Sequence, residues 1–258
     1  MGAQVFVGCG GSGILTLSQL NGLLAEDPYW RPRLSSDVYY VVLDTRTAEI
    51  EGFLQTIRRQ IGTADAPHVV GIRLAQGRSI LQPMVAEYFV RAFDGADKAK
   101  TAAKERLHAH WWTTAKGEPF VAEKVRPLQD GAGQCPPASY FLAWHDLPSI
   151  EGALVNLFTH EIPARRAGGA MPPLDDLRVT IVAGLAGGTG RGTWELVAFK
   201  IREILLDRFG IAPRPSVYLF DASTFHKLAA DKPETALAGA KLAVASPRAR
   251  APAREPGP

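Results

Sequence analysis

Short blocks of apolar residues alternate along the chain with stretches in which apolar residues recur every three or four positions. The first pattern predicts buried strands, and the second predicts helices that bury one face. The predicted strands are 3–7, 38–43, 68–72, 179–183 and 216–220. The predicted helices are 14–27, 50–57, 80–93, 97–110, 149–161 and 193–209. The alternation of strands and helices predicts an α/β fold with a doubly wound, mainly parallel sheet. Such a sheet binds ligands at the carboxyl ends of its strands.

Three segments interrupt this alternation. Residues 94–140 are read as an insertion with a Gly/Pro loop at 130–137, and 163–173 as an exposed connection. From 236 to 258 the chain is rich in Ala, Pro and Arg and loses the periodic pattern of bulky apolar residues, which predicts a disordered tail. One domain is therefore expected over 1–235. The change of composition is also expected of a coding sequence that is truncated or shifted in frame.

Composition narrows the function classes. The chain has 258 residues, 46% of them hydrophobic, and its formal net charge of +3 owes much to arginines near the C-terminus, so no nucleic-acid partner is expected. The two cysteines, Cys9 and Cys135, lie far apart, which argues against a disulfide framework or a zinc site and favours a reducing cytoplasm. No run approaches the roughly 18 apolar residues that span a bilayer, so membrane insertion is not expected.

Two glycine-rich segments each join a predicted strand to a predicted helix. The first consists of Gly8, Cys9, Gly10, Gly11, Ser12 and Gly13. The second consists of Gly184, Leu185, Ala186, Gly187, Gly188, Thr189, Gly190, Arg191 and Gly192. Free backbone N–H groups and the helix dipole favour an anion at such a junction, and glycine lets the backbone approach phosphate oxygens. We predict two phosphate-binding loops, with tight structural turns as the alternative.

The first segment alone also satisfies the dinucleotide pattern GxGxxG, and Asp44 after the second strand could supply its acidic residue. An NAD- or FAD-binding oxidoreductase domain is therefore an alternative. A second glycine segment of this length argues against it. The P-loop pattern fails because neither segment carries its lysine.

The run Gly187 to Gly192, GGTGRG, resembles the signature loop of the tubulin and FtsZ superfamily, and the first segment resembles the opening glycine loop of that family. The resemblance is closest to the bacterial tubulin-like proteins. It implies a Rossmann-like nucleotide-binding domain that binds GTP or GDP with Mg²⁺. It places Gly8 to Gly13 near the α- and β-phosphates and Ala186 to Gly192 around the β- and γ-phosphates. It places Asp44 and Thr45 near the γ-phosphate or its Mg²⁺, and Asp221 near the ribose. No metal-ligand set and no catalytic residue are assigned.

Three departures from the family qualify these implications. Arg191 replaces a small residue, so it either adds a phosphate contact or faces solvent. Leu15 occupies the position at which FtsZ has an asparagine that recognises guanine. The preference between guanine and adenine is therefore left open. The long central helix and the acidic segment that activates water in a neighbouring subunit are not found. The resemblance therefore implies binding, with GTPase activity on self-association into dimers or filaments if missing elements or a partner supply acidic residues. A scaffold that keeps the fold without using nucleotide is the remaining alternative.

Overall fold

The computed structural model describes residues 2–62, 65–74, 136–165 and 176–221. It contains one five-stranded sheet with the strand order β3-β2-β1-β4-β5, and all neighbouring strands pair in parallel. The strands are β1 (Gln4–Cys9), β2 (Val38–Asp44), β3 (His68–Arg73), β4 (Arg178–Gly184) and β5 (Ser216–Phe220). The predicted α/β fold with a doubly wound parallel sheet is confirmed, and all five predicted strands are present.

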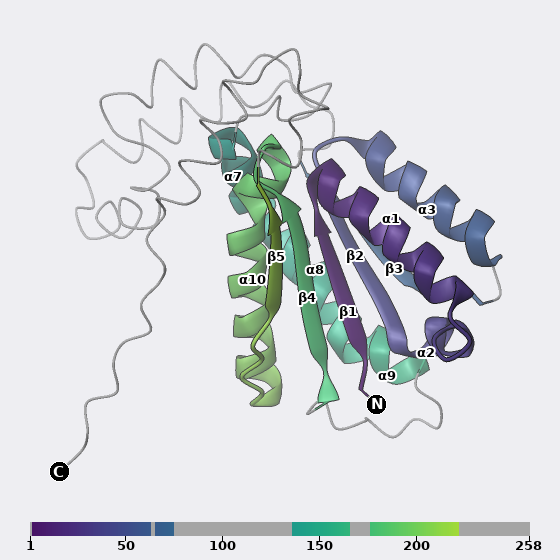
Figure 1. The fold of residues 1–258 in the computed structure, drawn as a ribbon. Coiled ribbons are helices and arrows are strands. Elements are labelled where there is room, and N and C mark those ends of the chain that lie inside the picture. The colour runs from purple at the N-terminus through teal and green to yellow at the C-terminus, as the bar shows by residue number, and fades with distance from the viewer. Residues whose placement is uncertain (1, 63–64, 75–135, 166–175, 222–258) are drawn as a thin grey trace, which may run out of the picture.

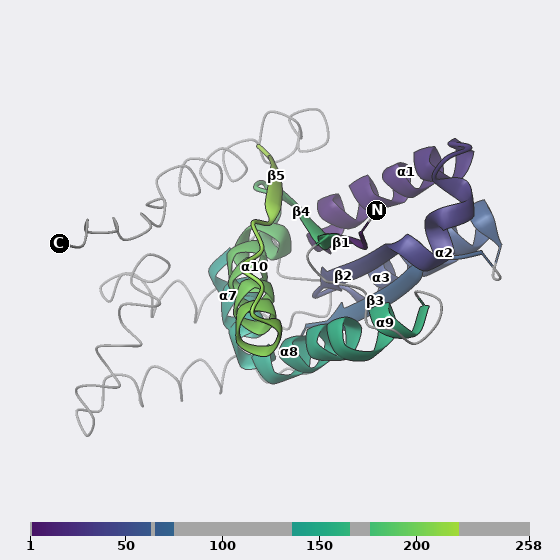
Figure 2. The same cartoon turned by 90° about the horizontal axis from the view of Figure 1, so that it is seen from below.

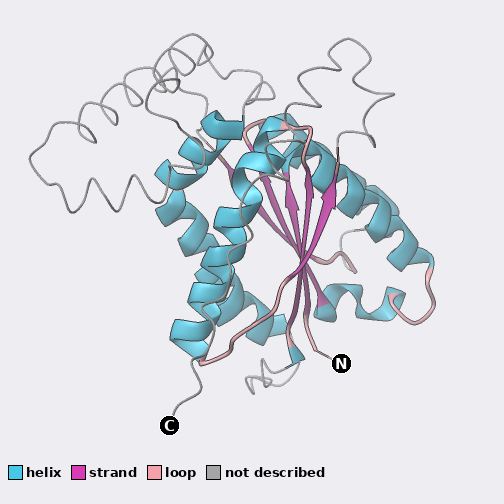
Figure 3. Cartoon of the chain, turned by 60° about the vertical axis from the view of Figure 1, so that its left-hand side comes forward, coloured by secondary structure: helices cyan, strands magenta, loops and turns pink. Residues whose placement is uncertain are grey.

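Helices cover both faces of the sheet (Figures 2 and 3). The helices along the first half of the chain are α1 (Gly10–Glu26), α2 (Leu34–Asp37) and α3 (Thr47–Ile61), with a 3₁₀ turn at Arg31–Arg33. The later ones are α7 (Pro136–His145), α8 (Leu147–Asn156), the π-helical turn η3 (Leu157–Glu161), α9 (Ile162–Arg165) and α10 (Gly188–Phe209). Helices α1 and α3 lie on one face, while α7, α8 and α10 lie on the other (Figure 1). None of the described helices is long and apolar enough to cross a membrane.

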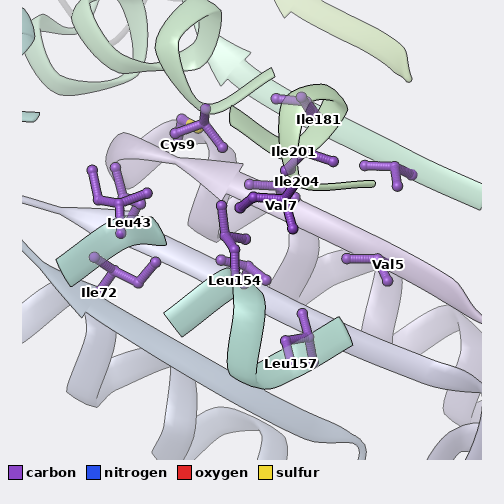
Figure 4. Close-up of a cluster of buried hydrophobic side chains, with 14 of the residues drawn as sticks. Val5, Val7, Cys9, Leu43, Ile72, Leu154, Leu157, Ile181, Ile201 and Ile204 are labelled. Atoms are coloured by element: carbon purple, nitrogen blue, oxygen red, sulfur yellow. The ribbon is translucent and has the colours of Figure 1, made fainter. Parts of the chain in front are cut away.

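Two apolar clusters fill the spaces between the layers. The larger one joins β1, β2 and β4 to α8 and α10, and it includes Val7, Leu154, Ile181 and Ile201 (Figure 4). The smaller one lies beneath α1 and α3 and includes Leu17 and Phe53. Strand β2 is buried along its whole length, which explains why its sequence is apolar without alternation. The glycine segments are thus carried by a sheet that is packed on both sides.

The chain reverses its winding direction between β1 and β4. Strands β2 and β3 follow β1 on one side, whereas β4 and β5 lie on the other. The register places Cys9, the last residue of β1, opposite Leu43 of β2 and Ala183 of β4, so the carboxyl ends of the three strands lie level. Open α/β sheets bind ligands at such a switch point.

Several predicted bounds are wrong. Helix α1 begins at Gly10 and α10 at Gly188, so most of each predicted loop is the first turn of a helix. Pro136 and Pro137 open α7 instead of closing a loop, since proline is well tolerated in the first helical turn. The expected connection at 163–173 begins inside α9. The predicted helices at 80–93 and 97–110, most of the insertion at 94–140 and the tail at 236–258 lie outside the described residues.

Candidate functional site

The first glycine segment leads from β1 into α1 without an intervening loop. Gly8 and Cys9 end the strand, and Gly10 opens the helix with φ of +74°. That backbone conformation is open to glycine and unfavourable for other residues. Cys9 holds the N-cap position but makes no side-chain capping hydrogen bond, and the first turn contains no acidic residue. The N–H groups of this turn are therefore not satisfied by a cap from their own helix.

The second glycine segment ends β4 and opens α10 in the same way. Gly187 is the N-cap, and Gly188 to Gly192 form the first turn, again without a side-chain cap or an acidic residue. Ala186 and Gly187 are partly exposed, while Gly188 to Gly192 are buried. Two helices, one on each face of the sheet, thus begin at the same edge with uncapped N-termini.

The two helix starts touch through their backbones. A Cβ atom placed on Gly190 would lie 2.6 Å from the carbonyl oxygen of Cys9, and one on Gly10 would lie 2.6 Å from the amide nitrogen of Gly190. Gly13 likewise packs against the carbonyl oxygen of Val182. Close backbone packing therefore requires glycine at these three positions, independently of any phosphate.

A polar group bridges β2 and α10 beside this contact. The hydroxyls of Thr45 and Thr189 are hydrogen-bonded at 3.0 Å, although the two residues are 144 positions apart. Both hydroxyl oxygens also lie within hydrogen-bond distance of Oδ1 of Asp44, that of Thr45 at 3.3 Å and that of Thr189 at 3.5 Å, so two hydroxyl protons are shared among these three contacts. The structure thus brings together Asp44, Thr45 and Thr189, which the family resemblance implies near the β- and γ-phosphates or their Mg²⁺.

Asp44 is the charged member of this group, and only 3% of its surface is exposed. Burial raises the pKa of its carboxyl group because the charged form loses water, and the nearby charge of Glu49 acts in the same direction. The backbone N–H of Arg46 donates to Oδ1 at 2.9 Å and partly opposes the rise in pKa. A buried carboxylate of raised pKa at the carboxyl ends of parallel strands is typical of functional sites.

Cys9 lies under the glycine segments and is fully buried. Its thiol makes a side-chain hydrogen bond with Thr193, whose hydroxyl also donates to the carbonyl oxygen of Thr189 at 2.8 Å. Burial raises the pKa of the Cys9 thiol to about 12, so the reactive thiolate is scarce at neutral pH. Cys9 therefore fills space beneath the site.

We expect Cys9 to resist alkylation in the folded protein. Iodoacetamide at pH 8 followed by peptide mass mapping should leave the Cys9 peptide unmodified, and the same treatment in guanidinium chloride should label it fully. The peptide map separates Cys9 from Cys135. Rapid labelling of Cys9 in the native protein would contradict this expectation.

Arg191 is not at the surface, since only 4% of it is exposed, and the solvent-facing alternative is wrong. It follows Thr189 by two residues, which is about 200° around a helix, so the two side chains leave α10 on nearly opposite sides. Burial lowers the pKa of its guanidinium, and the charge of Glu195 opposes that shift. A phosphate contact by Arg191 stays a prediction.

Asp221 follows β5 at the same edge and is exposed. Because β5 lies two strands from β1, Asp221 is roughly 10 Å along the edge from the first glycine segment. The sequence pattern did not point to two further charged residues at this edge, Arg46 and Glu49. Arg46 follows Thr45 directly, and Glu49 opens α3 with its carboxyl group beside Gly11. The signal available was their position just after the second predicted strand.

The residues present fit a magnesium ion that also binds phosphate oxygens. Mg²⁺ prefers one or two carboxylates, hydroxyl oxygens and water, and Asp44, Thr45 and Thr189 offer such oxygens together. Within the described residues no cluster of three or more His, Cys, Asp or Glu side chains is placed to hold a metal by itself. The donor set therefore suits a metal that arrives with a phosphate ligand.

Comparison with known proteins agrees with this geometry. Residues 5–232 match the family model described as tubulin like, which spans both glycine segments and all but the first residue of the sheet. No curated protein matches the chain. The parallel, doubly wound sheet is a nucleotide-binding fold of the tubulin and FtsZ type, and the chain belongs to the tubulin-like family.

Proposed function

We propose that this chain binds GTP and GDP, with Mg²⁺, at the switch point between β1 and β4. The observation that carries the proposal is the meeting of two uncapped helix N-termini, α1 and α10, in backbone contact at Gly10 and Gly190. Each N-terminus carries about half a positive charge and unpaired N–H donors, which suits a chain of phosphates better than a single anion. The guanine base is inferred from family membership.

Charge balance supports a role for the metal. The two helix ends contribute about one positive charge, and the carboxylate of Asp44 cancels about as much. A triphosphate therefore needs a further cation, and Mg²⁺ when bound would neutralise phosphate oxygens. Asp44, Thr45 and Thr189 would hold it. The thiol of Cys9 and the hydroxyl of Thr193 support the backbone from below.

Hydrolysis is proposed only for a self-associated form, as dimers or filaments in the cytoplasm. Among the described residues, the carboxylates identified near the glycine segments are those of Asp44, Glu49 and Glu195, and Asp44 already accepts a hydrogen bond from the backbone N–H of Arg46 and lies against the hydroxyls of Thr45 and Thr189. An acidic residue that orients the attacking water would then come from a neighbouring subunit. Positioning and charge stabilisation are the main sources of rate in phosphoryl transfer.

Calorimetric titration and thermal denaturation with GTP, GDP, ATP and NAD test the proposal. Binding of GTP and GDP with a raised melting temperature supports it, because a ligand that binds the folded state stabilises that state. Binding of NAD alone would favour an oxidoreductase domain. Stabilisation by none of the four would favour a scaffold.

The hydroxyl of Thr189 offers a sharper probe. Thr189→Val keeps the shape of the side chain but removes a hydroxyl at the phosphate edge, and we expect GTP affinity to fall about tenfold, or ~1.4 kcal/mol. Thr56→Val is the matched control, because the Thr56 hydroxyl donates to the carbonyl oxygen of Gly52 at an exposed position of α3, away from the glycine segments. Equal affinities of the two variants would argue against a phosphate contact by Thr189.

A further inference from the structure

An ion pair between Arg46 and Glu49 lies beside the first glycine segment. Arg46 is the N-cap of α3, and Glu49 lies in the first turn of that helix. Their side chains meet at 3.2 Å, and 52% of the arginine side chain and 38% of the glutamate side chain are exposed. Ion pairs this exposed contribute little to stability, so other charged partners can replace them at small cost.

The other oxygen of the Glu49 carboxyl group faces α1. A Cβ atom placed on Gly11 would lie 3.6 Å from Cδ of Glu49 and 3.8 Å from its Oε2. Gly11 is the second residue of α1, whose own first turn has no acidic residue and no side-chain cap. A carboxylate from a different helix thus lies where the positive end of the α1 dipole attracts an anion.

This position conflicts with a phosphate at the same helix end. Two anions cannot share one helix N-terminus without repulsion, and Asp44 already lies close, with its Oδ2 3.9 Å from the same Cβ position on Gly11. Glu49 also contributes to the raised pKa of the Asp44 carboxyl group, which shows that its charge is felt in the site. A phosphate that approaches Gly11 must therefore displace the Glu49 carboxylate.

Displacement of Glu49 would free the guanidinium of Arg46. The planar fork of arginine matches phosphate geometry and makes charge-assisted hydrogen bonds stronger than an exposed ion pair. The backbone N–H of Arg46 is fixed to Asp44 at 2.9 Å, so the residue stays at the phosphate edge when its side chain changes partner. Arg46 is thus suited to supply the side-chain cation that the missing P-loop lysine would otherwise provide.

We propose that Glu49 is an intramolecular competitor for the phosphate position on α1 and that Arg46 binds phosphate once Glu49 is displaced. This inference rests on the proposed nucleotide binding and adds a regulatory contact to the same site. In this exchange, a phosphate replaces the Glu49 carboxylate both at the N-terminus of α1 and at the side chain of Arg46.

Titration of GTP, GDP and guanosine into Glu49→Gln and Arg46→Gln variants tests the exchange. Glu49→Gln removes the competing charge, so GTP and GDP should bind about three- to tenfold tighter, while guanosine binding stays unchanged. Arg46→Gln keeps the backbone N–H and should weaken GTP and GDP binding about tenfold, again without effect on guanosine. The double variant should remain weaker than Glu49→Gln, because the phosphate contact of Arg46 is absent in it.

A second exposed ion pair, between α3 and β3, provides the control. Glu51 of α3 pairs with Arg73 of β3 at 3.2 Å, with 54% and 46% of the two side chains exposed. Glu51→Gln and Arg73→Gln change the net charge equally and should alter nucleotide affinity less than twofold. Melting temperatures of the ligand-free variants report whether each remains folded.

The outcomes separate the two proposals. If the wild-type protein binds no nucleotide, both proposals fail. If it binds GTP but Glu49→Gln leaves the affinity unchanged or lowers it, the competitor role fails while nucleotide binding stands. If Arg46→Gln and Arg73→Gln lost equal nucleotide affinity, the effect of Arg46 would be general electrostatic attraction. The proposed phosphate contact of Arg46 would then be overturned.

Discussion

Replacement of Asp44 by asparagine should make the ligand-free protein more stable at pH 7 and less responsive to Mg²⁺. The amide oxygen can keep the hydrogen bond from the backbone N–H of Arg46 and one from a threonine hydroxyl, and the substitution removes a charge that burial disfavours. We expect a gain of about 1 kcal/mol, which corresponds to a melting temperature about 3 °C higher for a domain of this size. Denaturant unfolding of the two proteins measures it.

The gain should depend on pH in a defined direction. The folded protein holds the Asp44 proton more tightly than the unfolded chain, because the pKa of Asp44 is raised on folding. Ionisation therefore costs folding free energy above the folded pKa, and this cost disappears below the unfolded value near 4. The stability difference between Asp44→Asn and wild type should therefore decrease as the pH is lowered from 7 and vanish below about 4.

A surface carboxylate provides the control for charge alone. Asp207→Asn, at an exposed position of α10, changes the net charge by the same amount and should leave stability within about 0.5 kcal/mol of wild type. In the same set of proteins, chelation of Mg²⁺ should weaken GTP binding to wild type but change it little in Asp44→Asn. A variant that is less stable at pH 7 would contradict the cost assigned to the buried charge, and one whose GTP binding depends on Mg²⁺ as strongly as that of wild type would remove Asp44 from the proposed metal contact.

The second large effect is expected at Gly190. A methyl group there would lie 2.6 Å from the carbonyl oxygen of Cys9 and 3.0 Å from that of Gly184, and both are backbone atoms of central strands. Because neither strand can shift without disturbing the sheet, Gly190→Ala should cost about 3 kcal/mol and lower the melting temperature by about 10 °C. Thermal and denaturant unfolding test this.

Gly52→Ala is the matched control, since Gly52 is an exposed residue within α3 and an added Cβ would meet nothing within 4 Å. Alanine there should stabilise the protein by about 0.5–1 kcal/mol, because glycine in a helix interior is entropically unfavourable. If Gly190→Ala were as well tolerated as Gly52→Ala, the contact between α1 and α10 would not be tight. In that case the glycines would be explained by ligand approach instead.

The distances at Gly190 bear on why both segments are rich in glycine. Phosphate approach and backbone contact both require the absence of a side chain, and the sequence does not distinguish the two reasons. Only the structure shows that Gly10, Gly13 and Gly190 face other backbone atoms, whereas Gly11 faces the carboxyl groups of Asp44 and Glu49. Gly11 is therefore the glycine of the first segment that borders the anion position.

The sequence by itself determined the strands, the α/β class and the two glycine segments. Each of these is a local signal. An apolar, β-branched run such as 38–43 is typical of a buried strand, and clustered glycines are typical of a junction between a strand and a helix. Strand β5 agrees with its predicted range at both ends, although Tyr218 is 61% exposed in the structure. The local pattern therefore predicted the type of element correctly even where the side chains of that element are exposed.

Tertiary structure alone decided where the helices begin and which residues meet. Glycine disfavours helix, so the local sequence argues for a loop where α1 and α10 have already started, and the packed parallel sheet overrides that preference. The hydrogen bond between Thr45 and Thr189 joins residues 144 positions apart, and Glu49 reaches Gly11 from another helix. Periodicity carries no information on such contacts, because they depend on how separate elements are aligned at one edge of the sheet.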